Sequence, residues 1–299
     1  MQELAPIALF VYNRPEHTKQ TISYLQKNFL AEESDLFIFS DNAKYGENRK
    51  NVDEVRALIK DTEGFKSVKI YENSINYGLA QSIIKGVSLM MKVYGVVIVF
   101  EDDLLSSPYT LQYFNDALNR YADEEKVMHI GAYMYPLEEK NLPQTFFYRA
   151  ATSWGWATWD RAWKNFNPDI NALMKQFDKP KKDAFTIERT MNFWRQMKEF
   201  KAGENDSWAI RWYASVFLSG GLALNPAKSL IQNIGHDGSG VHSNKEEMYQ
   251  VQLDQHEIKY FPTEVAENPE AYAAIKQFLK IRKGSIWARI KRYIIKNFW

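Results

Sequence analysis

Three consecutive carboxylates, Glu101, Asp102 and Asp103, follow an apolar run that covers residues 96–100. Adjacent carboxylates repel one another and cost free energy to remove from water unless a positive group lies against them. Hard oxygen ligands suit Mg²⁺ or Mn²⁺, which keep open positions for the phosphates of a substrate. The cluster therefore predicts a cation site, and a solvated loop after a strand is the alternative.

Polar side chains also follow three earlier apolar runs, at the points where those runs end: Asn13 and Arg14, Asp41 and Asn42, and Asn73. In open α/β sheets, ligands bind in the crevice at the carboxyl ends of the strands. We therefore expect these side chains to share a crevice with the acidic cluster. Neither a GxxxxGKS/T loop nor GxGxxG follows any predicted strand, which disfavours a P-loop nucleotidase and a dinucleotide enzyme.

The first half of the chain alternates short apolar runs with helical patterns. The apolar runs predict four strands, at 6–12, 35–41, 67–73 and 95–102. The intervening segments predict helices that begin near Pro15 and cover 47–60 and 78–94. This alternation indicates an α/β fold with a mostly parallel, Rossmann-like sheet, in which 96–100 is a central strand covered on both faces.

The second half contains more Pro, Gly and aromatic residues. Its patterns predict short strands near 145–149, 221–225 and 229–234, and helices near 157–165, 184–200 and 207–218. We therefore expect three parts: a nucleotide-binding half at 1–125, a mixed half at 126–262, and a helical tail at 263–299.

Composition limits the class of protein. The 299 residues are 45% hydrophobic and 25% charged, as is usual for a soluble globular protein. The chain has no Cys, which excludes disulfides, thiolate metal sites and a Cys nucleophile. No signal peptide or membrane-spanning run is recognisable, so the cytoplasm is the expected compartment.

The C-terminal tail is basic, although the net charge of the whole chain is only +1. Residues 271–299 carry eight Lys and Arg and no acid, and apolar residues recur at helical spacing among them, at Ile286, Trp287, Ile290, Tyr293, Ile294 and Phe298. A basic amphipathic helix of this kind favours peripheral contact with a membrane surface. The alternative is a helix packed on the body. Nucleic acid is not an expected partner, because the body is acidic and no recognition motif is present.

Several sequence blocks together resemble a known family. YNRP at the end of the first strand, SD at the end of the second, NYGLAQSI, VVIVFEDDLLSSPYTLQYF, FFYRAATSWGWATWDRAW, ENDSWAIRWYAS and GHDGSGVHS occur in this order. The chain thereby resembles inverting glycosyltransferases of the glycosyltransferase-A fold, of the N-acetylglucosaminyltransferase I type, over roughly residues 5–245.

The resemblance implies roles for the residues at the strand ends. Asp103 would be the direct protein ligand of Mn²⁺ (or Mg²⁺), and Glu101 and Asp102 would contact the ribose or donor sugar. Arg14 would lie near the nucleotide diphosphate. Asp41 would accept from the uracil N3–H, a donor that cytosine lacks. Without the resemblance, Arg14 could be a surface residue and Asp41 a helix cap.

The resemblance also implies a general base, because an inverting transferase must deprotonate the acceptor hydroxyl. Asp206 lies in the block that carries the base, and Glu204 is the second candidate. Asp206 also stands where a helix should begin, so a capping role competes with the catalytic one.

Aromatic residues and the glycine-rich segment supply the remaining candidates. Gly155 allows close approach to a sugar, and we expect Trp156 to form a wall of the site, whereas Trp208 and Trp212 are expected in the core. His236 and His242 could reach phosphate or metal from a loop that closes over the donor. A surface turn with idle histidines is the alternative.

The sequence thus predicts a metal-dependent transferase that moves GlcNAc or another hexose from a UDP-sugar to a glycan or lipid-linked acceptor. Residues 1–125 would bind the nucleotide sugar, and 126–262 would bind the acceptor. Two other functions are considered: a non-catalytic carbohydrate-binding protein on the same fold, and a sugar-phosphate nucleotidyltransferase. The latter usually has a glycine-rich signature after the first strand, where this chain has YNRPEH.

Overall fold

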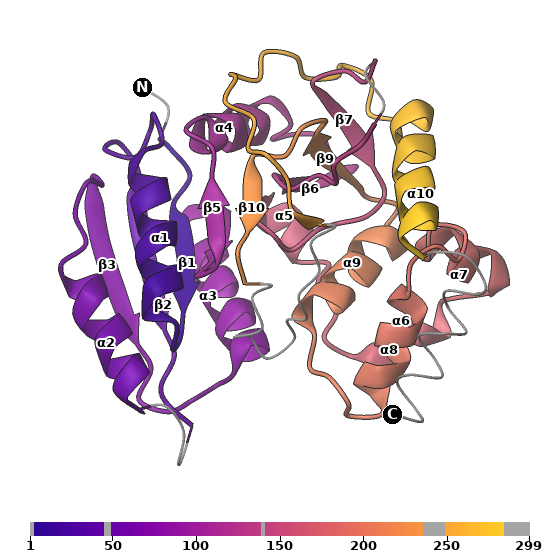
Figure 1. Ribbon diagram of the computed structural model, residues 1–299. Coiled ribbons are helices and arrows are strands. Elements are labelled where there is room, and N and C mark those ends of the chain that lie inside the picture. The colour runs from indigo at the N-terminus through magenta and orange to yellow at the C-terminus, as the bar shows by residue number, and fades with distance from the viewer. Residues whose placement is uncertain (1–2, 45–48, 139–140, 236–248, 284–299) are drawn as a thin grey trace.

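A computed structural model describes residues 3–44, 49–138, 141–235 and 249–283. Its centre is an eight-stranded sheet in the order β3-β2-β1-β4-β8-β6-β9-β7 (Figure 1). The strands are β1 (Ile7–Val11), β2 (Asp35–Ser40), β3 (Ser67–Glu72), β4 (Val96–Glu101), β6 (Val127–Gly131), β7 (Thr145–Tyr148), β8 (Trp156–Trp159) and β9 (Leu222–Pro226). β1 to β4 are parallel; β8 is antiparallel to both β4 and β6, and β7 is antiparallel to β9. The predicted α/β fold with a mostly parallel sheet is confirmed.

Helices cover both faces of the first half of the sheet (Figure 1). They are α1 (Pro15–Gln26), α2 (Arg49–Lys60), α3 (Leu79–Tyr94) and α4 (Thr110–Arg120). Alternate residues of each strand point to opposite faces. Leu9 and Ile98 therefore pack in one core with residues of α1, α2 and α4, whereas Phe10 and Val99 pack in another with residues of α3. Burial on both faces explains why the run at 96–100 is continuously apolar.

The second half adds further helices: α5 (Asp160–Trp163), α6 (Ile170–Lys175), α7 (Lys179–Phe185), α8 (Phe193–Lys201), α9 (Trp208–Leu218) and α10 (Pro269–Lys283). The sheet continues from β4 directly into β8, so both halves share it. Ala271, Ile275 and Leu279 of α10 are buried in a third core with residues of α6 to α9. This part of the tail packs on the body. The amphipathic pattern from Ile286 to Phe298 lies outside the described residues.

Two short strands form a separate antiparallel ribbon. β5 (Leu104–Ser106) follows the acidic cluster directly, and it pairs with β10 (Ile231–Asn233). The segment before the glycine-rich block is thereby joined to the end of the central strand, although more than a hundred residues separate them.

The structure differs from the predicted elements in several places, and it adds α4, α6, α7 and β5, which were not predicted. The predicted helix at 157–165 is β8 followed by the single turn α5, because WATW lies buried between β4 and β6. The predicted helix at 184–200 is interrupted by positive φ angles at 187–189, so only α8 remains. β6 was not predicted. Its apolar pattern is short, and tertiary pairing rather than local propensity stabilises it.

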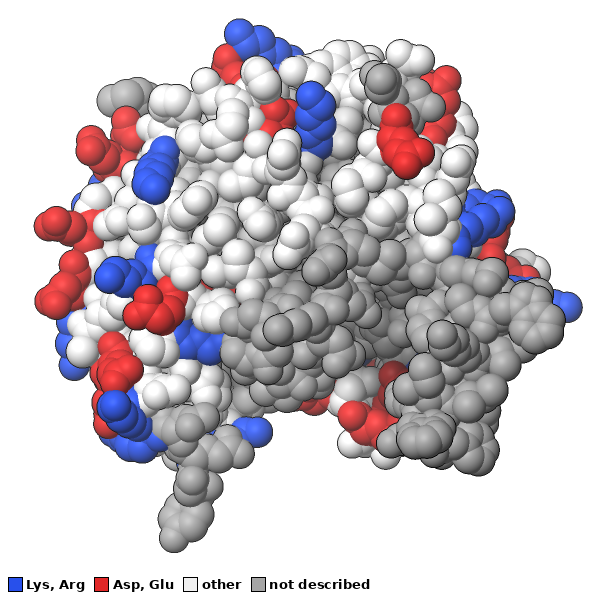
Figure 2. Space-filling view, viewed as in Figure 1, with Lys and Arg blue, Asp and Glu red and all other residues white. Residues whose placement is uncertain are grey.

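The surface of this protein mixes both signs of charge. In Figure 2, Lys and Arg are interspersed with Asp and Glu on the left of the molecule, the side on which Figure 1 places α2 and β3. Two i,i+4 ion pairs on α2 contribute, Arg49 with Asp53 and Lys50 with Glu54. Among the described residues, no helix has the length and apolar character needed to cross a bilayer.

Candidate functional site

The acidic cluster lies against a positive group from the neighbouring strand end. Arg14 follows β1, and β1 pairs in parallel with β4, which ends at Glu101. The Arg14 guanidinium donates through Nη2 to Asp102 Oδ1 and, at 2.9 Å, to Asp103 Oδ2. Adjacent parallel strands therefore bring together four of the residues that the sequence predicted at this edge.

Helix α1 fixes the turn that carries the two aspartates. The Thr21 hydroxyl donates to the main-chain oxygen of Asp102 at 2.8 Å and accepts from the Leu104 N–H at 3.2 Å. Thr21 is completely buried. The buried Thr21 hydroxyl therefore fixes the backbone of the turn that carries the Asp102 and Asp103 carboxylates.

The cluster contains too little positive charge to balance its three carboxyl groups. Burial, together with the negative charges of Asp103 and Asp102, raises the pKa of Glu101 to about 8, although Arg14 opposes the shift. Burial also raises the pKa of Asp102 to about 6, although Arg14 opposes the shift. Burial by itself would lower the pKa of Arg14, but the two aspartates raise it above its ordinary value. One guanidinium does not suffice to keep all three carboxyl groups ionised, so a further cation would be stabilised here.

The segment after β10 packs directly on this cluster. The Ile234 N–H donates to the Asp103 main-chain oxygen at 2.9 Å. A Cβ atom at Gly235 would collide with Asp103 Oδ2 and lie 3.0 Å from Arg14 Nη1. Gly235 is thus the one residue type that fits, and it places the start of the glycine-rich block beside the carboxylates. His236 and His242 lie outside the described residues, so their roles stay predictions.

Asp41 lies within a network of hydrogen bonds from the protein itself. Its carboxylate is 6% exposed, and its Oδ2 accepts from the Gly78 N–H at 2.8 Å. The Tyr77 N–H donates to both carboxylate oxygens at 3.0 and 3.1 Å, and the Asn42 N–H and Asn73 Nδ2 donate to Oδ1. These four donors occupy both oxygens. Asp41 therefore holds the 73–78 loop, and its predicted contact with uracil would require the loss of these bonds.

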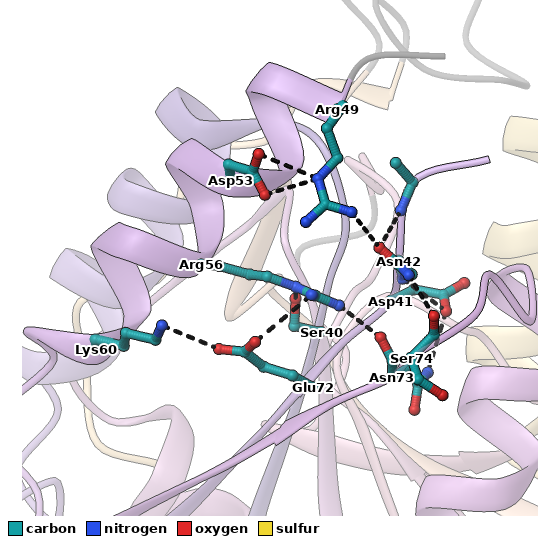
Figure 3. Close-up of polar contacts among 11 residues, drawn as sticks. Ser40, Asp41, Asn42, Arg49, Asp53, Arg56, Lys60, Glu72, Asn73 and Ser74 are labelled. Atoms are coloured by element: carbon teal, nitrogen blue, oxygen red, sulfur yellow. Dashed lines mark hydrogen bonds and ion pairs between the residues drawn. The ribbon is translucent and has the colours of Figure 1, made fainter. Parts of the chain in front are cut away.

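The polar network continues behind Asp41, as Figure 3 shows. Arg56 of α2 donates to the Asn73 main-chain oxygen at 2.7 Å and forms an ion pair with Glu72, which Lys60 also contacts. Both ends of the loop are thus held: one by Asp41 and the other by α2.

Asp206 lies at the start of α9, but it does not cap this helix. The Ser207 hydroxyl accepts from the Ile210 N–H and forms the cap. The Asp206 side chain is exposed and its Oδ2 lies 4.0 Å from the Cβ position of Gly78, at the loop that Asp41 holds. The competing role of Asp206 as a cap is therefore wrong, and its carboxylate is available to a ligand. Glu204, two residues earlier in the sequence, is also exposed.

Trp156 does not form a wall of the site. It is completely buried in the core between the sheet and α9, where its ring stacks on Trp208 at 5.1 Å between centroids. The prediction of Trp156 as a binding residue is wrong, because β8 points this side chain into the interior. Trp208 and Trp212 are buried as predicted.

Gly78 is a residue of the site that the sequence did not reveal. It has a φ of 75°, begins α3, and connects the Asp41 carboxylate to the neighbourhood of Asp206. Its signal was the NYG turn before an apolar helical pattern, which resembles an ordinary helix start.

A divalent cation fits this site if the phosphates of a bound substrate supply most of its ligands. The described residues contain no group of three or more His, Cys, Asp or Glu that could enclose a metal ion. Asp103 nevertheless offers a carboxylate that is 15% exposed at a strand end, in a cluster with excess negative charge. Mg²⁺ is commonly held by one or two carboxylates and substrate phosphates. Asp103 and the neighbouring Asp102 match that arrangement.

Comparison with known proteins gives only weak likenesses. No protein-family profile matches the chain, and no curated protein matches it. Among solved structures, it is similar to the mannosyltransferase PcManGT of Pyrobaculum calidifontis, in complex with GDP-Man and Mn²⁺, with a TM-score of 0.40 and 12% identity over 73% of each chain. It is also similar to S. aureus TarS, with a TM-score of 0.42 and 13% identity over 76% of this chain and 36% of that one. A likeness of this size assigns the chain to no family.

Proposed function

We propose that this protein is a metal-dependent, inverting glycosyltransferase that moves GlcNAc or another hexose from a UDP-sugar to a glycan or lipid-linked acceptor. The observation that carries the proposal is the pairing of Arg14 with Asp102 and Asp103 at adjacent parallel strand ends. Ligands of open α/β sheets bind at this edge. The sequence blocks that resemble the N-acetylglucosaminyltransferase I type support the same assignment.

Arg14 and Asp103 would together bind the donor diphosphate. Mn²⁺ or Mg²⁺, when bound, would neutralise the charge that develops on the leaving diphosphate. Arg14 would donate to diphosphate oxygens, because a planar guanidinium suits bidentate contact with phosphate. Asp102 and Glu101 would accept from hydroxyls of the ribose or donor sugar. Gly235, which carries no side chain, would leave room beside Asp103 and Arg14 for the donor.

Asp206 would act as the general base. In an inverting displacement, the acceptor hydroxyl attacks the anomeric carbon from the face opposite the diphosphate, and a carboxylate removes its proton. Asp206 suits this role because its carboxylate is exposed and Ser207 provides the helix cap instead. Arg211 supports this position, since its guanidinium lies 3.4 Å from the Asp206 main-chain oxygen.

We also propose that the protein acts in the cytoplasm, at the inner face of the cell membrane, through its basic C-terminal segment. A lipid-linked acceptor would be presented at such a surface. Deletion of residues 284–299 should release the protein from vesicles that contain anionic lipid while turnover of a soluble acceptor persists. Unchanged vesicle binding would contradict this part of the proposal.

Donor turnover and a base variant test the proposed activity. Purified protein should transfer sugar from one member of a panel of UDP-sugars. The Asp206→Asn variant should lose at least ~100-fold in transfer while it still binds the donor, since general bases contribute about 10²–10⁴-fold. Glu204→Gln is the matched control, with transfer near the wild-type rate.

The outcomes separate the alternatives. Binding of carbohydrate without any binding of UDP in the presence of Mn²⁺ would support a non-catalytic carbohydrate-binding protein. Release of pyrophosphate from a nucleoside triphosphate and a sugar phosphate would support a nucleotidyltransferase. An equal loss of transfer in Asp206→Asn and Glu204→Gln would contradict the assignment of Asp206 as the general base.

A further inference from the structure

Buried polar atoms without partners gather in one region of the interior, away from the acidic cluster. Among the described residues, seven buried side-chain nitrogen and oxygen atoms have no hydrogen-bond partner. Five of them belong to neighbouring parts of the second half: His129, Tyr148, Thr152, Trp156 and Asn225. A buried polar group without a partner costs free energy, so this concentration requires an explanation.

The strand registers place most of these residues on the same face of the sheet. Gly131 of β6 lies opposite Trp156 of β8, and His129 lies opposite Ala223 of β9. Because side chains alternate along a strand, Asn225 shares the face of Ala223. His129, Gly131 and Asn225 therefore share one face of the sheet, where His129 and Asn225 are completely buried and His129 contacts Trp212 of α9.

The protonation of His129 follows from its neighbour. Trp212 Nε1, which can only donate, lies 3.1 Å from His129 Nδ1, so Nδ1 accepts and the proton resides on Nε2. This Nε2–H is among the atoms without a partner. Burial lowers the pKa of His129 to about 3, and the main-chain carbonyl of Thr152 opposes the shift. That carbonyl is therefore near Nε2, although their geometry does not form a hydrogen bond.

The Asn225 and Thr152 side chains both lie beside Gly131. A Cβ atom on Gly131 would lie 2.7 Å from Asn225 Oδ1 and 2.8 Å from Thr152 Oγ1. These two oxygens thus flank one position, yet they do not hydrogen-bond to each other. The Asn225 amide nitrogen donates to the Ala223 main-chain oxygen at 3.0 Å, which fixes Oδ1 as the atom turned toward Thr152.

We propose that His129 Nε2, Thr152 Oγ1 and Asn225 Oδ1 form a binding site for an internal water molecule. The ligand must accept from the imidazole N–H and donate to the amide oxygen, and the Thr152 hydroxyl can complete a third bond. Buried waters typically make about three such bonds. A metal cation is disfavoured because the imidazole presents its N–H, and an anion because Asn225 presents an acceptor. This inference is independent of the proposed activity.

The water would fix the segment between β7 and β8 to the sheet. Thr152 lies in this segment, between Tyr148 at the end of β7 and Trp156 at the start of β8. Its hydroxyl has no other partner among the described residues. The bridge to β6 and β9 would therefore hold the backbone of 150–155 in place, including Gly155, whose φ is 66°.

A crystal structure of the full chain at a resolution that shows ordered water tests the site directly. We expect a single water within 2.6–3.2 Å of all three atoms, the usual range for hydrogen bonds. Direct hydrogen bonds among these side chains, or no density between them, would overturn the proposal.

Thermal unfolding tests it in solution. Thr152→Val removes the hydroxyl and retains the shape, and it should lower Tm by at least about 2 °C, as expected for loss of a buried hydrogen-bond network in a chain of this size. Thr152→Ser retains the hydroxyl and should keep the bound water in its crystal structure. Thr62→Val is the matched control, because Thr62 Oγ1 is also buried without a partner but lies outside this group. An equal response of Thr152→Val and Thr62→Val would contradict a water bridge.

Discussion

Asp41→Asn changes the carboxylate that holds the 73–78 loop, with almost no change in shape. The Asp41 oxygens accept from the N–H groups of Gly78 and Tyr77 and from two further donors. The Asn side chain has one oxygen, so its NH₂ group must face at least one of these donors. Loss of one charge-assisted bond costs about 1.5–3 kcal/mol, and an unsatisfied buried donor costs about 1–3 kcal/mol. Because these costs overlap, we expect destabilisation of about 2–4 kcal/mol.

Urea unfolding followed by tryptophan fluorescence measures this loss, with Asp61→Asn as the control at an exposed position. The control should change the free energy of unfolding by less than about 0.5 kcal/mol. Binding of UDP and CDP to Asp41→Asn then separates two roles. A residue that positions the loop should weaken both nucleotides alike. A stability change below about 0.5 kcal/mol, together with a shift of preference from UDP to CDP, would refute our interpretation and restore Asp41 as the uracil-reading residue.

Two further predictions concern Gly235 and His129. Gly235→Ala places a methyl group against Asp103 and Arg14, and it should weaken nucleotide binding about tenfold or more, since overpacking costs about 1–3 kcal/mol; unchanged affinity in calorimetry would contradict the close packing. The pKa of His129 falls from 6.5 to about 3 on folding, so between these values the unfolded chain binds more protons and stability falls as pH falls, by up to about 1.4 kcal/mol per pH unit. Between pH 6 and 4.5, the free energy of unfolding in urea should depend less steeply on pH for His129→Gln than for wild type.

The first half of the fold could be predicted from sequence because its signals are local. β1, β2 and β4 are apolar runs that end at or shortly before polar residues, so the sequence indicates the strand ends and the candidate ligands together. The grouping of Arg14 with Asp102 and Asp103 follows from the parallel pairing of β1 with β4, since adjacent parallel strands end at the same edge.

The second half could not be predicted as well, because tertiary contacts decide it. The WATW segment is compatible with a helix in isolation, but pairing with β4 and β6 makes it a strand and buries Trp156. The role of Asp41 depends on two N–H groups that lie 36 and 37 positions further along the chain. The proposed water site likewise depends on residues from β6, β9 and the segment between β7 and β8.

Calorimetric titration of UDP in the presence and absence of Mn²⁺ tests the central claim most directly, with wild type and Asp103→Ala compared in the same buffer. If the edge formed by Arg14, Asp102 and Asp103 binds a nucleotide diphosphate together with a divalent cation, wild type should bind UDP with Mn²⁺ and lose most of that affinity in EDTA. Asp103→Ala should show little gain from Mn²⁺. UDP binding that is equally tight with and without Mn²⁺, or that is unchanged in Asp103→Ala, would contradict the proposed site.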